Sequence, residues 1–262
     1  MLRRSPPSLF RPTRAIDQSV LEENRVLIQS IDRRKILRGG LSLGALAMLT
    51  GCDVTRRDSV QGVLKRVSEW NDRAQALLFR PNHLAPTYRA EQVVKPPRFN
   101  AYYDVEDLAP VNGETWKLEL AGRVGDKRAW TLRQIYDLPE QELIIRHICV
   151  EGWDYIGQWS GVNLRLFLER IGADLTAKYV AFRCFDDYYG SIDMASALHP
   201  QTLLATKYAG EPITDPFGFP LRLRTAVKLG FKNPKWITAM EVTNTYRGGY
   251  WEDRGFNWFS GI

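Results

Sequence analysis

The sequence predicts an α+β fold, and two observations support this prediction. Short strand-like runs alternate irregularly with short helical patterns, without the regular strand–helix–strand rhythm of a doubly wound sheet. The composition is that of a globular protein, with 44% hydrophobic and 25% charged residues and no low-complexity tract. The residues after Cys52 are numerous enough for one domain with a sizeable core.

The first predicted element is an amphipathic helix at residues 61–80. Its apolar residues recur at helical spacings of three, four and seven: Val60, Leu64, Val67, Ala74 and Leu78. Pro81 is expected to end this helix, because proline cannot continue the hydrogen-bonding pattern. The proline-containing stretch 81–97 is expected to form a loop that wraps a surface.

Strands and short helices are expected to follow. Strict alternation over residues 116–120 predicts a half-buried strand. Thr131 is expected to cap a short helix that runs to residue 136. Residues 143–150 are mostly apolar and predict a strand that places Cys149 at its end.

The second half of the chain is also expected to contain both helices and strands. Asn163 is expected to cap a helix that carries an apolar face and ends at Gly172. Further strands are expected at residues 179–185, 220–224 and 236–246.

Residues 1–52 are expected to form an export leader. The basic segment Asp32-Arg33-Arg34-Lys35-Ile36-Leu37-Arg38 precedes an apolar run, 39–51, which is too short to span about 30 Å of hydrocarbon. This arrangement resembles a twin-arginine signal, and the alternative is a basic amphipathic tail. Leu49-Thr50-Gly51-Cys52 resembles a bacterial lipobox with Cys52 as the lipidated residue; the alternative is ordinary cleavage with Cys52 incidental.

The positive charge belongs mostly to this leader. Residues 1–52 contain nine basic and four acidic residues, whereas the remaining chain contains 27 and 26. The mature part therefore has no global basic field, which argues against a nucleic-acid partner. Its apolar runs do not approach membrane-spanning length.

Cys149 is the first candidate for chemistry. The chain has three cysteines and no CxxC pair, so a disulfide framework is not expected. Cys149 lies where a strand-like run breaks, in Arg146-His147-Ile148-Cys149-Val150-Glu151-Gly152-Trp153, and is a candidate nucleophile or metal ligand. The alternative is an inert buried cysteine. His147 shares the strand face of Cys149, but a structural histidine is favoured over a Cys–His nucleophile.

A cluster of cations is the second candidate. Residues 222–235 contain five of them: Arg222, Arg224, Lys228, Lys232 and Lys235. Cations and backbone donors in a glycine-containing loop suit a phosphate; the alternative is a strand edge protected by lysines. Asp186 and Asp187 could bind a cation, although a turn is the commoner explanation.

These motifs together resemble the molybdopterin-binding domain of the sulfite oxidase superfamily. The resemblance rests on residues 147–153 and Trp159-Ser160-Gly161-Val162, and extends over about residues 99–246 through the motifs at 99–104, 177–182, 198–200, 220–223 and 228–232. The bacterial periplasmic branch that includes the protein-methionine-sulfoxide reductase catalytic subunit is the most similar. The resemblance implies a mixed-sheet fold of this type in residues 99–262, preceded by the leader and by a helix and linker at 53–98.

The resemblance also implies a site. One molybdenum would be held by a single molybdopterin and by the Cys149 thiolate, with Glu151 and Trp153 on the substrate side. The implied cofactor-binding residues are Asn100, Tyr103, Asp104, Cys184, Arg222, Lys228, Lys232, Asn233 and Lys235. Two positions depart from the branch: Cys184 replaces a threonine, and Phe217 replaces an asparagine or histidine.

The expected function is two-electron oxygen-atom transfer to or from a small molecule or an oxidised protein. Sulfite oxidases follow their cysteine with basic residues, so Glu151 argues against sulfite. The chain contains no CxxCH haem motif, so a membrane haem or quinone-linked electron partner is expected. Export by the twin-arginine route and a lipid on Cys52 would keep the enzyme near that partner. The alternative from another class is a non-catalytic lipoprotein binding module on the same fold.

Overall fold

The computed structural model describes residues 58–262, so the twin-arginine sequence and Cys52 lie outside the described residues. Helix α4 (Asp58–Leu78) confirms the helix expected before Pro81. It belongs to a different compact unit from Arg80–Ile262. No helix within residues 58–262 has the length and apolar character to cross a membrane.

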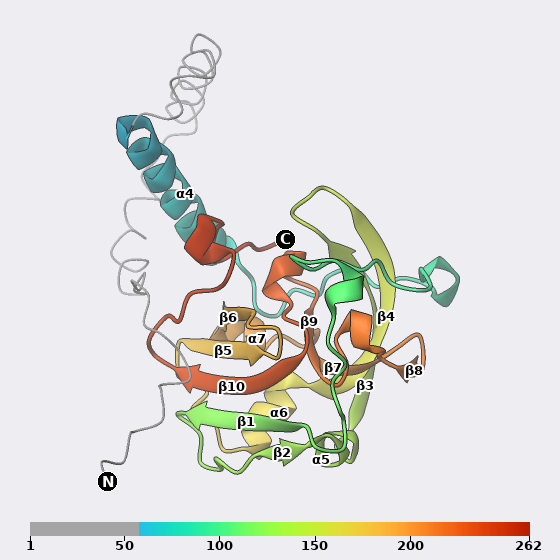
Figure 1. Cartoon of the computed structure of the whole chain (residues 1–262). Helices are drawn as coiled ribbons and strands as arrows, with labels where there is room; N and C mark the ends of the chain where they lie inside the picture. Colours follow the sequence, from blue (N-terminus) through green and yellow to red (C-terminus); the bar gives the residue numbers. More distant parts are fainter. Residues whose placement is uncertain (1–57) are drawn as a thin grey trace. The chain divides into compact units, whose positions relative to one another are not determined.

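The unit from Arg80 to Ile262 is built on two five-stranded sheets (Figure 1). The first has the order β2-β1-β10-β5-β6; the second has the order β3-β4-β7-β8, with β9 also paired to β7. Strands β1 and β10 run parallel, whereas the other pairs are antiparallel. The predicted mixed-sheet α+β class is therefore confirmed.

The bounds of the elements are as follows. The first sheet contains β1 (Lys117–Gly122), β2 (Trp130–Thr131), β5 (Tyr179–Cys184), β6 (Tyr189–Asp193) and β10 (Ile237–Thr243). The second sheet contains β3 (Glu140–Ile148), β4 (Asp154–Asn163), β7 (Thr202–Tyr208), β8 (Glu211–Pro212) and β9 (Arg222–Thr225). The helices are α5 (Leu132–Tyr136), α6 (Leu164–Arg170), α7 (Met194–Ala197) and the 3-10 turns η2 (Ala90–Gln92), η3 (Val105–Asp107), η4 (Asp215–Phe217), η5 (Gly230–Lys232) and η6 (Glu252–Arg254).

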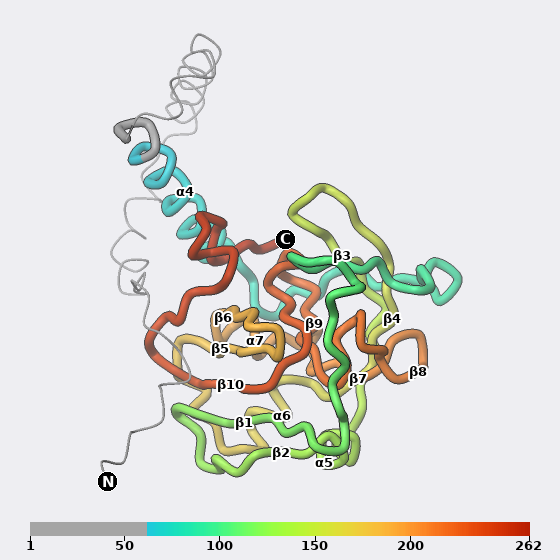
Figure 2. Tube along the Cα trace, in the orientation of Figure 1, coloured from blue at the N-terminus to red at the C-terminus, as the bar shows by residue number. Residues whose placement is uncertain are grey.

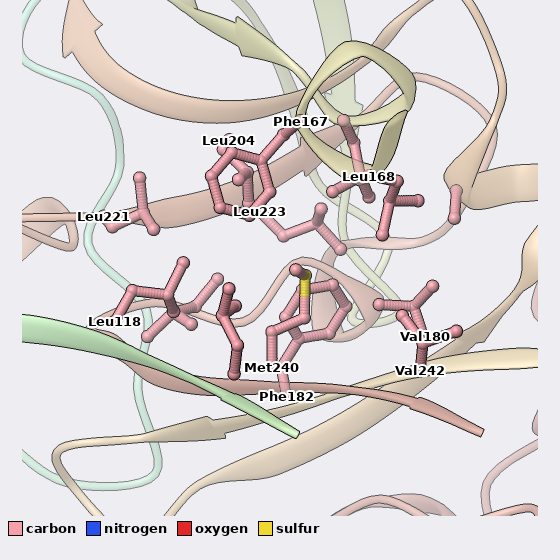
Figure 3. Close-up of a cluster of buried hydrophobic side chains, with 14 of the residues drawn as sticks. Leu118, Phe167, Leu168, Val180, Phe182, Leu204, Leu221, Leu223, Met240 and Val242 are labelled. Atoms are coloured by element: carbon pink, nitrogen blue, oxygen red, sulfur yellow. The ribbon is translucent and has the colours of Figure 1, made fainter. Parts of the chain in front are cut away.

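A hydrophobic core fills the space between the sheets (Figure 3). Leu118, Phe182 and Met240 from the first sheet face Leu223 from the second and Phe167 from α6. These side chains are buried almost completely. Burying one leucine or phenylalanine stabilises a fold by roughly 1.5–3 kcal/mol, so this core holds the two sheets together.

Both predicted helix caps are confirmed. Thr131 caps α5 because its hydroxyl accepts a hydrogen bond from the amide of Gln134, and the Gln134 side-chain oxygen accepts one from the Thr131 amide. Asn163 caps α6 with its side-chain oxygen, which accepts a hydrogen bond from the Arg165 amide at 3.0 Å. Each cap satisfies donors that the first helical turn leaves without a partner.

All five expected strands are present, as β1, β3, β5, β9 and β10, whereas β2, β4, β6, β7 and β8 were not predicted. Strand β1 has the predicted alternation, and β3 ends at the residue before Cys149. Two of the strands that were not predicted, β4 and β7, lie side by side in the second sheet. Strand β4 contains Gly157 and Gly161, which dilute its apolar pattern. Gly161 is required there, since a Cβ would lie 2.1 Å from the carbonyl oxygen of Leu204.

The segment 81–97 wraps the second sheet, as predicted (Figure 2 traces its course). Thr87 forms a bridge with Ile145 of β3, and the Val94 amide donates to the Ile156 carbonyl of β4 at 3.0 Å. The segment thus follows the strands that lead to and from Cys149.

Candidate active site

A pocket lies where turns from the two sheets meet. The second sheet contributes the turn between β3 and β4, with Cys149 and Glu151. The first sheet contributes the turn between β5 and β6, with Asp186. The remaining walls come from Asn100 and its neighbours, from the start of β9, from the η5–β10 connection and from Trp251.

Cys149 is held at the pocket by a tight turn. Its amide donates to the Trp153 carbonyl at 2.9 Å, and the Gly152 amide donates back to the Cys149 carbonyl at 3.1 Å. Gly152 has a φ of +91°, a conformation that favours glycine. Burial raises the pKa of the Cys149 thiol, so the thiolate needs a nearby positive charge such as a metal ion.

Glu151 and Trp153 interact with each other beside this cysteine. The Trp153 indole nitrogen donates to Glu151 Oε2 at 2.7 Å, and the same oxygen lies 3.7 Å from Cys149 Sγ. Arg98, which the sequence did not suggest, packs its guanidinium 4.4 Å from the Trp153 ring centroid. The structure therefore brings the three predicted catalytic residues together.

Arg222 lies at another wall of the pocket, at the start of β9. It is 4% exposed, packs 4.5 Å from the Trp159 ring centroid, and donates from one terminal nitrogen to the Phe217 carbonyl at 2.8 Å. Its Nε is buried without a hydrogen-bond partner within residues 58–262. Burial lowers the pKa of Arg222, as expected for a buried cation that no carboxylate compensates.

Lys235 is the second cation of the pocket. Its ammonium donates to the Asn100 carbonyl and lies 4.2 Å from the Trp236 ring centroid. Burial, followed by repulsion from Arg222, holds the pKa of Lys235 well below its usual range. Among the described residues, Arg222 and Lys235 form no ion pair, so an anion in this pocket would relieve their repulsion.

Asn233 also lines the pocket, and its side chain holds the loop between Arg222 and Lys235 in place. Its Oδ1 accepts from the Thr225 amide at 2.7 Å and from Arg224 at 3.0 Å, while its Nδ2 donates to the Leu229 carbonyl at 3.0 Å. This arrangement leaves Arg224 as a structural residue, which also donates to the Arg146 carbonyl at 2.6 Å.

The structure does not bring Lys228 or Lys232 to the pocket. Lys228 is buried and lies 2.9 Å from Asp193 Oδ1, and Lys232 is buried and ion-paired with Glu252. Burial alone would raise the pKa of Asp193, but Lys228 and hydrogen bonds from Ser196 outweigh it and lower that pKa. Their binding of the cofactor phosphate remains a prediction.

Four other predicted residues lie outside the pocket lining, including Trp153, which contacts the lining through Glu151. Tyr103 packs on Trp236 with 6.1 Å between ring centroids, behind the wall. Asp104 is exposed at the start of η3. Cys184 is buried in the core at the end of β5, and burial holds the pKa of its thiol well above its usual range. The contact of Tyr103, Asp104 and Cys184 with the cofactor also remains a prediction.

Several lining residues were not predicted: Tyr102, Asp186, Tyr188, Trp236 and Trp251. Asp186 and Asp187 were interpreted as a turn, and the turn is present, with Asp187 at a φ of +62°. The aromatic residues had no sequence signal, because they come from four separate segments of the chain. His147 is buried, as expected of a structural histidine, and burial, then repulsion from Arg224, holds its pKa well below the usual range.

Known proteins are similar to this chain in sequence. Residues 105–251 match the family described as the oxidoreductase molybdopterin binding domain. The "Putative protein-methionine-sulfoxide reductase subunit YedZ1" of Azospira oryzae is 51% identical over 229 residues, 87% of each chain. The protein-methionine-sulfoxide reductase catalytic subunit MsrP of Campylobacter jejuni is 29% identical over 54% of this chain and 53% of its own, so the match spans about half of that relative.

A solved structure, the sulfane dehydrogenase SoxCD from Paracoccus pantotrophus, matches 53% of this chain and 40% of its own, with a TM-score of 0.49 and 16% identity. The family assignment therefore rests on the sequence matches.

The fold, the pocket and these matches define a molybdopterin-binding oxidoreductase. The chain belongs to the oxidoreductase molybdopterin binding domain family, the sulfite oxidase type to which its motifs were similar. It is a molybdenum cofactor-dependent enzyme, and the binding-module alternative is set aside.

The pocket residues fit this cofactor. A thiol, which is a soft metal donor once deprotonated, lies at one wall in Cys149. Arg222 and Lys235 lie at other walls without carboxylate partners among the described residues, and the buried Arg222 Nε has no acceptor there. A ligand with a soft metal and an anionic phosphate would satisfy both features.

Proposed function

We propose that the protein reduces methionine sulfoxide, free or in an oxidised protein, by two-electron oxygen-atom transfer at a molybdenum ligated by Cys149. The observation that carries this proposal is the 51% identity, over 87% of both chains, to a relative named as a protein-methionine-sulfoxide reductase subunit. Glu151 supports it, because a carboxylate at the pocket would repel an anion such as sulfite but tolerate a neutral sulfoxide.

Each pocket residue has a distinct task in this proposal. Cys149 would hold the metal, while Arg222 and Lys235 would hold the anionic end of the cofactor. Glu151 and Trp153, joined by their 2.7 Å hydrogen bond, would shape the side where substrate enters. The bound molybdenum cofactor supplies the two-electron redox chemistry.

The electrons would come from a separate protein. The chain has no CxxCH motif, and the match to a subunit of a reductase supports a partner chain. We propose a membrane haem or quinone-linked protein, with the enzyme exported to the periplasmic side and held near the membrane by a lipid on Cys52.

Metal analysis combined with an activity assay tests the proposed function. We expect near-stoichiometric molybdenum in protein purified from a molybdate-replete host, together with reduction of methionine sulfoxide by an artificial low-potential electron donor. Sulfite oxidation with an artificial acceptor is the control and should be at background. A molybdenum-loaded protein that oxidises sulfite and leaves methionine sulfoxide intact would contradict the proposal.

Export and anchoring can be tested separately. Replacing Arg33 and Arg34 with lysine should retain the protein in the cytoplasm, because the paired arginines are the feature that resembles the export signal. Replacing Cys52 with serine should release the exported protein from the membrane fraction. Fractionation followed by immunoblotting gives both results, and a Cys52→Ser protein that stays on the membrane would refute the lipid anchor.

A further inference from the structure

Among the described residues, only two of those lining the pocket carry a carboxyl group, Glu151 and Asp186. They come from different sheets: Glu151 lies in the turn after β3, and Asp186 lies in the turn after β5. Glu151 accepts the Trp153 hydrogen bond beside Cys149. Asp186 has no task in the mechanism described above.

Hydrogen bonds hold the Asp186 side chain and backbone in position. Its Oδ1 accepts from the Tyr188 amide at 3.2 Å, and its Oδ2 accepts from the Tyr103 hydroxyl at 3.2 Å. Within residues 58–262 it forms no ion pair with a cation. The Tyr102 hydroxyl donates to the Asp186 carbonyl, which ties the residue to a third segment of the pocket wall.

We propose that Asp186 is the proton donor of this site, delivering a proton from its carboxyl to the oxygen atom that leaves the substrate. This inference rests on the proposed sulfoxide reduction. It assigns the residue from three observations: Asp186 lines the same pocket as Cys149, it is the lining carboxyl that comes from the other sheet, and it forms no ion pair within residues 58–262.

The chemistry of the reduction requires such a donor. A sulfoxide takes up two electrons and two protons to give a thioether and water; the S–O bond breaks and two O–H bonds form. The bound cofactor would supply the two electrons, and the proposed redox partner would replace them. Asp186 provides one proton and becomes a carboxylate, and the second proton comes from solvent water. Asp186 then regains a proton from water, to which it remains partly exposed. General acids of this kind contribute about 10²–10⁴-fold to rate.

Burial of Asp186 favours its protonated form. Burial raises the pKa of Asp186 above its ordinary value, and the hydrogen bonds of Tyr188 and Tyr103, with the more distant Lys235, offset this only in part. The other titratable or charged groups nearby are Tyr102, Cys184 and Asp187, together with Cys149, Glu151 and Arg222 of the pocket lining. A larger fraction of a carboxyl with a raised pKa is protonated near neutral pH, so it can donate a proton there more often than an ordinary aspartate.

The direction of the pH dependence follows. The pKa of Asp186 is higher in the folded state than in the unfolded state. Its contribution to the free energy of unfolding is therefore complete below the unfolded-state pKa and is lost as the pH rises through the folded-state pKa. The proton donor is lost over the same range, so turnover should fall as pH rises there.

Asp186→Asn is the decisive variant, because asparagine keeps the acceptor for the Tyr188 amide and removes the acidic proton. We expect kcat at neutral pH to fall about 100-fold or more, with KM changed less than about threefold. The fall of kcat with rising pH, present in the wild type, should disappear. Asp186→Glu should restore part of the rate. Asp187→Asn, in the same turn but outside the pocket lining, is the matched control and should retain wild-type kcat.

A second measurement does not depend on the loaded enzyme. In cofactor-free protein, carbon-13 NMR of the Asp186 carboxyl should show a titration above the ordinary aspartate range, assigned by its absence in Asp186→Asn. The inference is overturned if the wild type reduces methionine sulfoxide and Asp186→Asn keeps both its kcat and its pH profile. A molybdenum-loaded wild type that leaves methionine sulfoxide intact would instead refute the proposed function.

Discussion

Replacing Cys149 with serine should abolish sulfoxide reduction while leaving the fold intact. Cys149 is the described thiol at the pocket; the other, Cys184, is in the core and does not line it. A serine hydroxyl has a similar size, but it is a hard, weakly acidic donor that does not replace a thiolate on a soft metal. The loss should therefore appear in kcat and not in folding.

Molybdenum content and thermal unfolding, measured on one preparation, check this expectation. The Cys149 side chain is small and lies in a turn held by backbone hydrogen bonds, so a change of about 1 kcal/mol in unfolding free energy, or about 2–4 °C in Tm, is the most we expect. Cys149→Ala is the matched variant and should be equally inactive. Turnover by Cys149→Ser at the wild-type rate would show that the thiolate is not the metal's ligand.

Replacing Arg222 with methionine should have opposite effects on cofactor binding and on the stability of cofactor-free protein. The guanidinium is buried at the pocket and lacks a carboxylate partner among the described residues. One charge-assisted hydrogen bond to a phosphate is worth roughly 1.5–3 kcal/mol, so removing it should weaken cofactor affinity about 10–150-fold. Replacing a buried charge by a similar apolar side chain is often neutral or stabilising by about 1–4 kcal/mol.

Lys228→Met is the control for this experiment. Lys228 is buried against Asp193, and removing it leaves a buried carboxylate without its cation, which costs about 3–5 kcal/mol. The double variant Lys228→Met with Asp193→Asn should recover stability. If Lys228→Met instead lowers molybdenum content in a protein of unchanged Tm, the predicted phosphate role of Lys228 is supported. An Arg222→Met protein with full molybdenum content would remove Arg222 from the cofactor site.

The local elements could be predicted because their causes lie within a few residues. The caps at Thr131 and Asn163 use hydrogen bonds to amides two or three residues away. The apolar run before Cys149 predicted the strand that delivers it to the pocket. Strand β4 escaped prediction because Gly157 and Gly161 dilute its apolar pattern, and Gly161 is explained only by the approach of Leu204 from β7.

The sequence by itself determined the family, the candidate metal ligand Cys149 and a cluster of cations near residues 222–235. Which groups lie beside those cations was decided only by the tertiary structure. Lys228 and Lys232 are neutralised by Asp193 and Glu252 from other segments, whereas Arg222 and Lys235 reach the pocket without such partners among the described residues. It also brought Asp186 into the same pocket as Cys149, from the other sheet. The reason is physical: a buried charge is stabilised by whatever group the fold places beside it, and that neighbour is set by packing between distant segments.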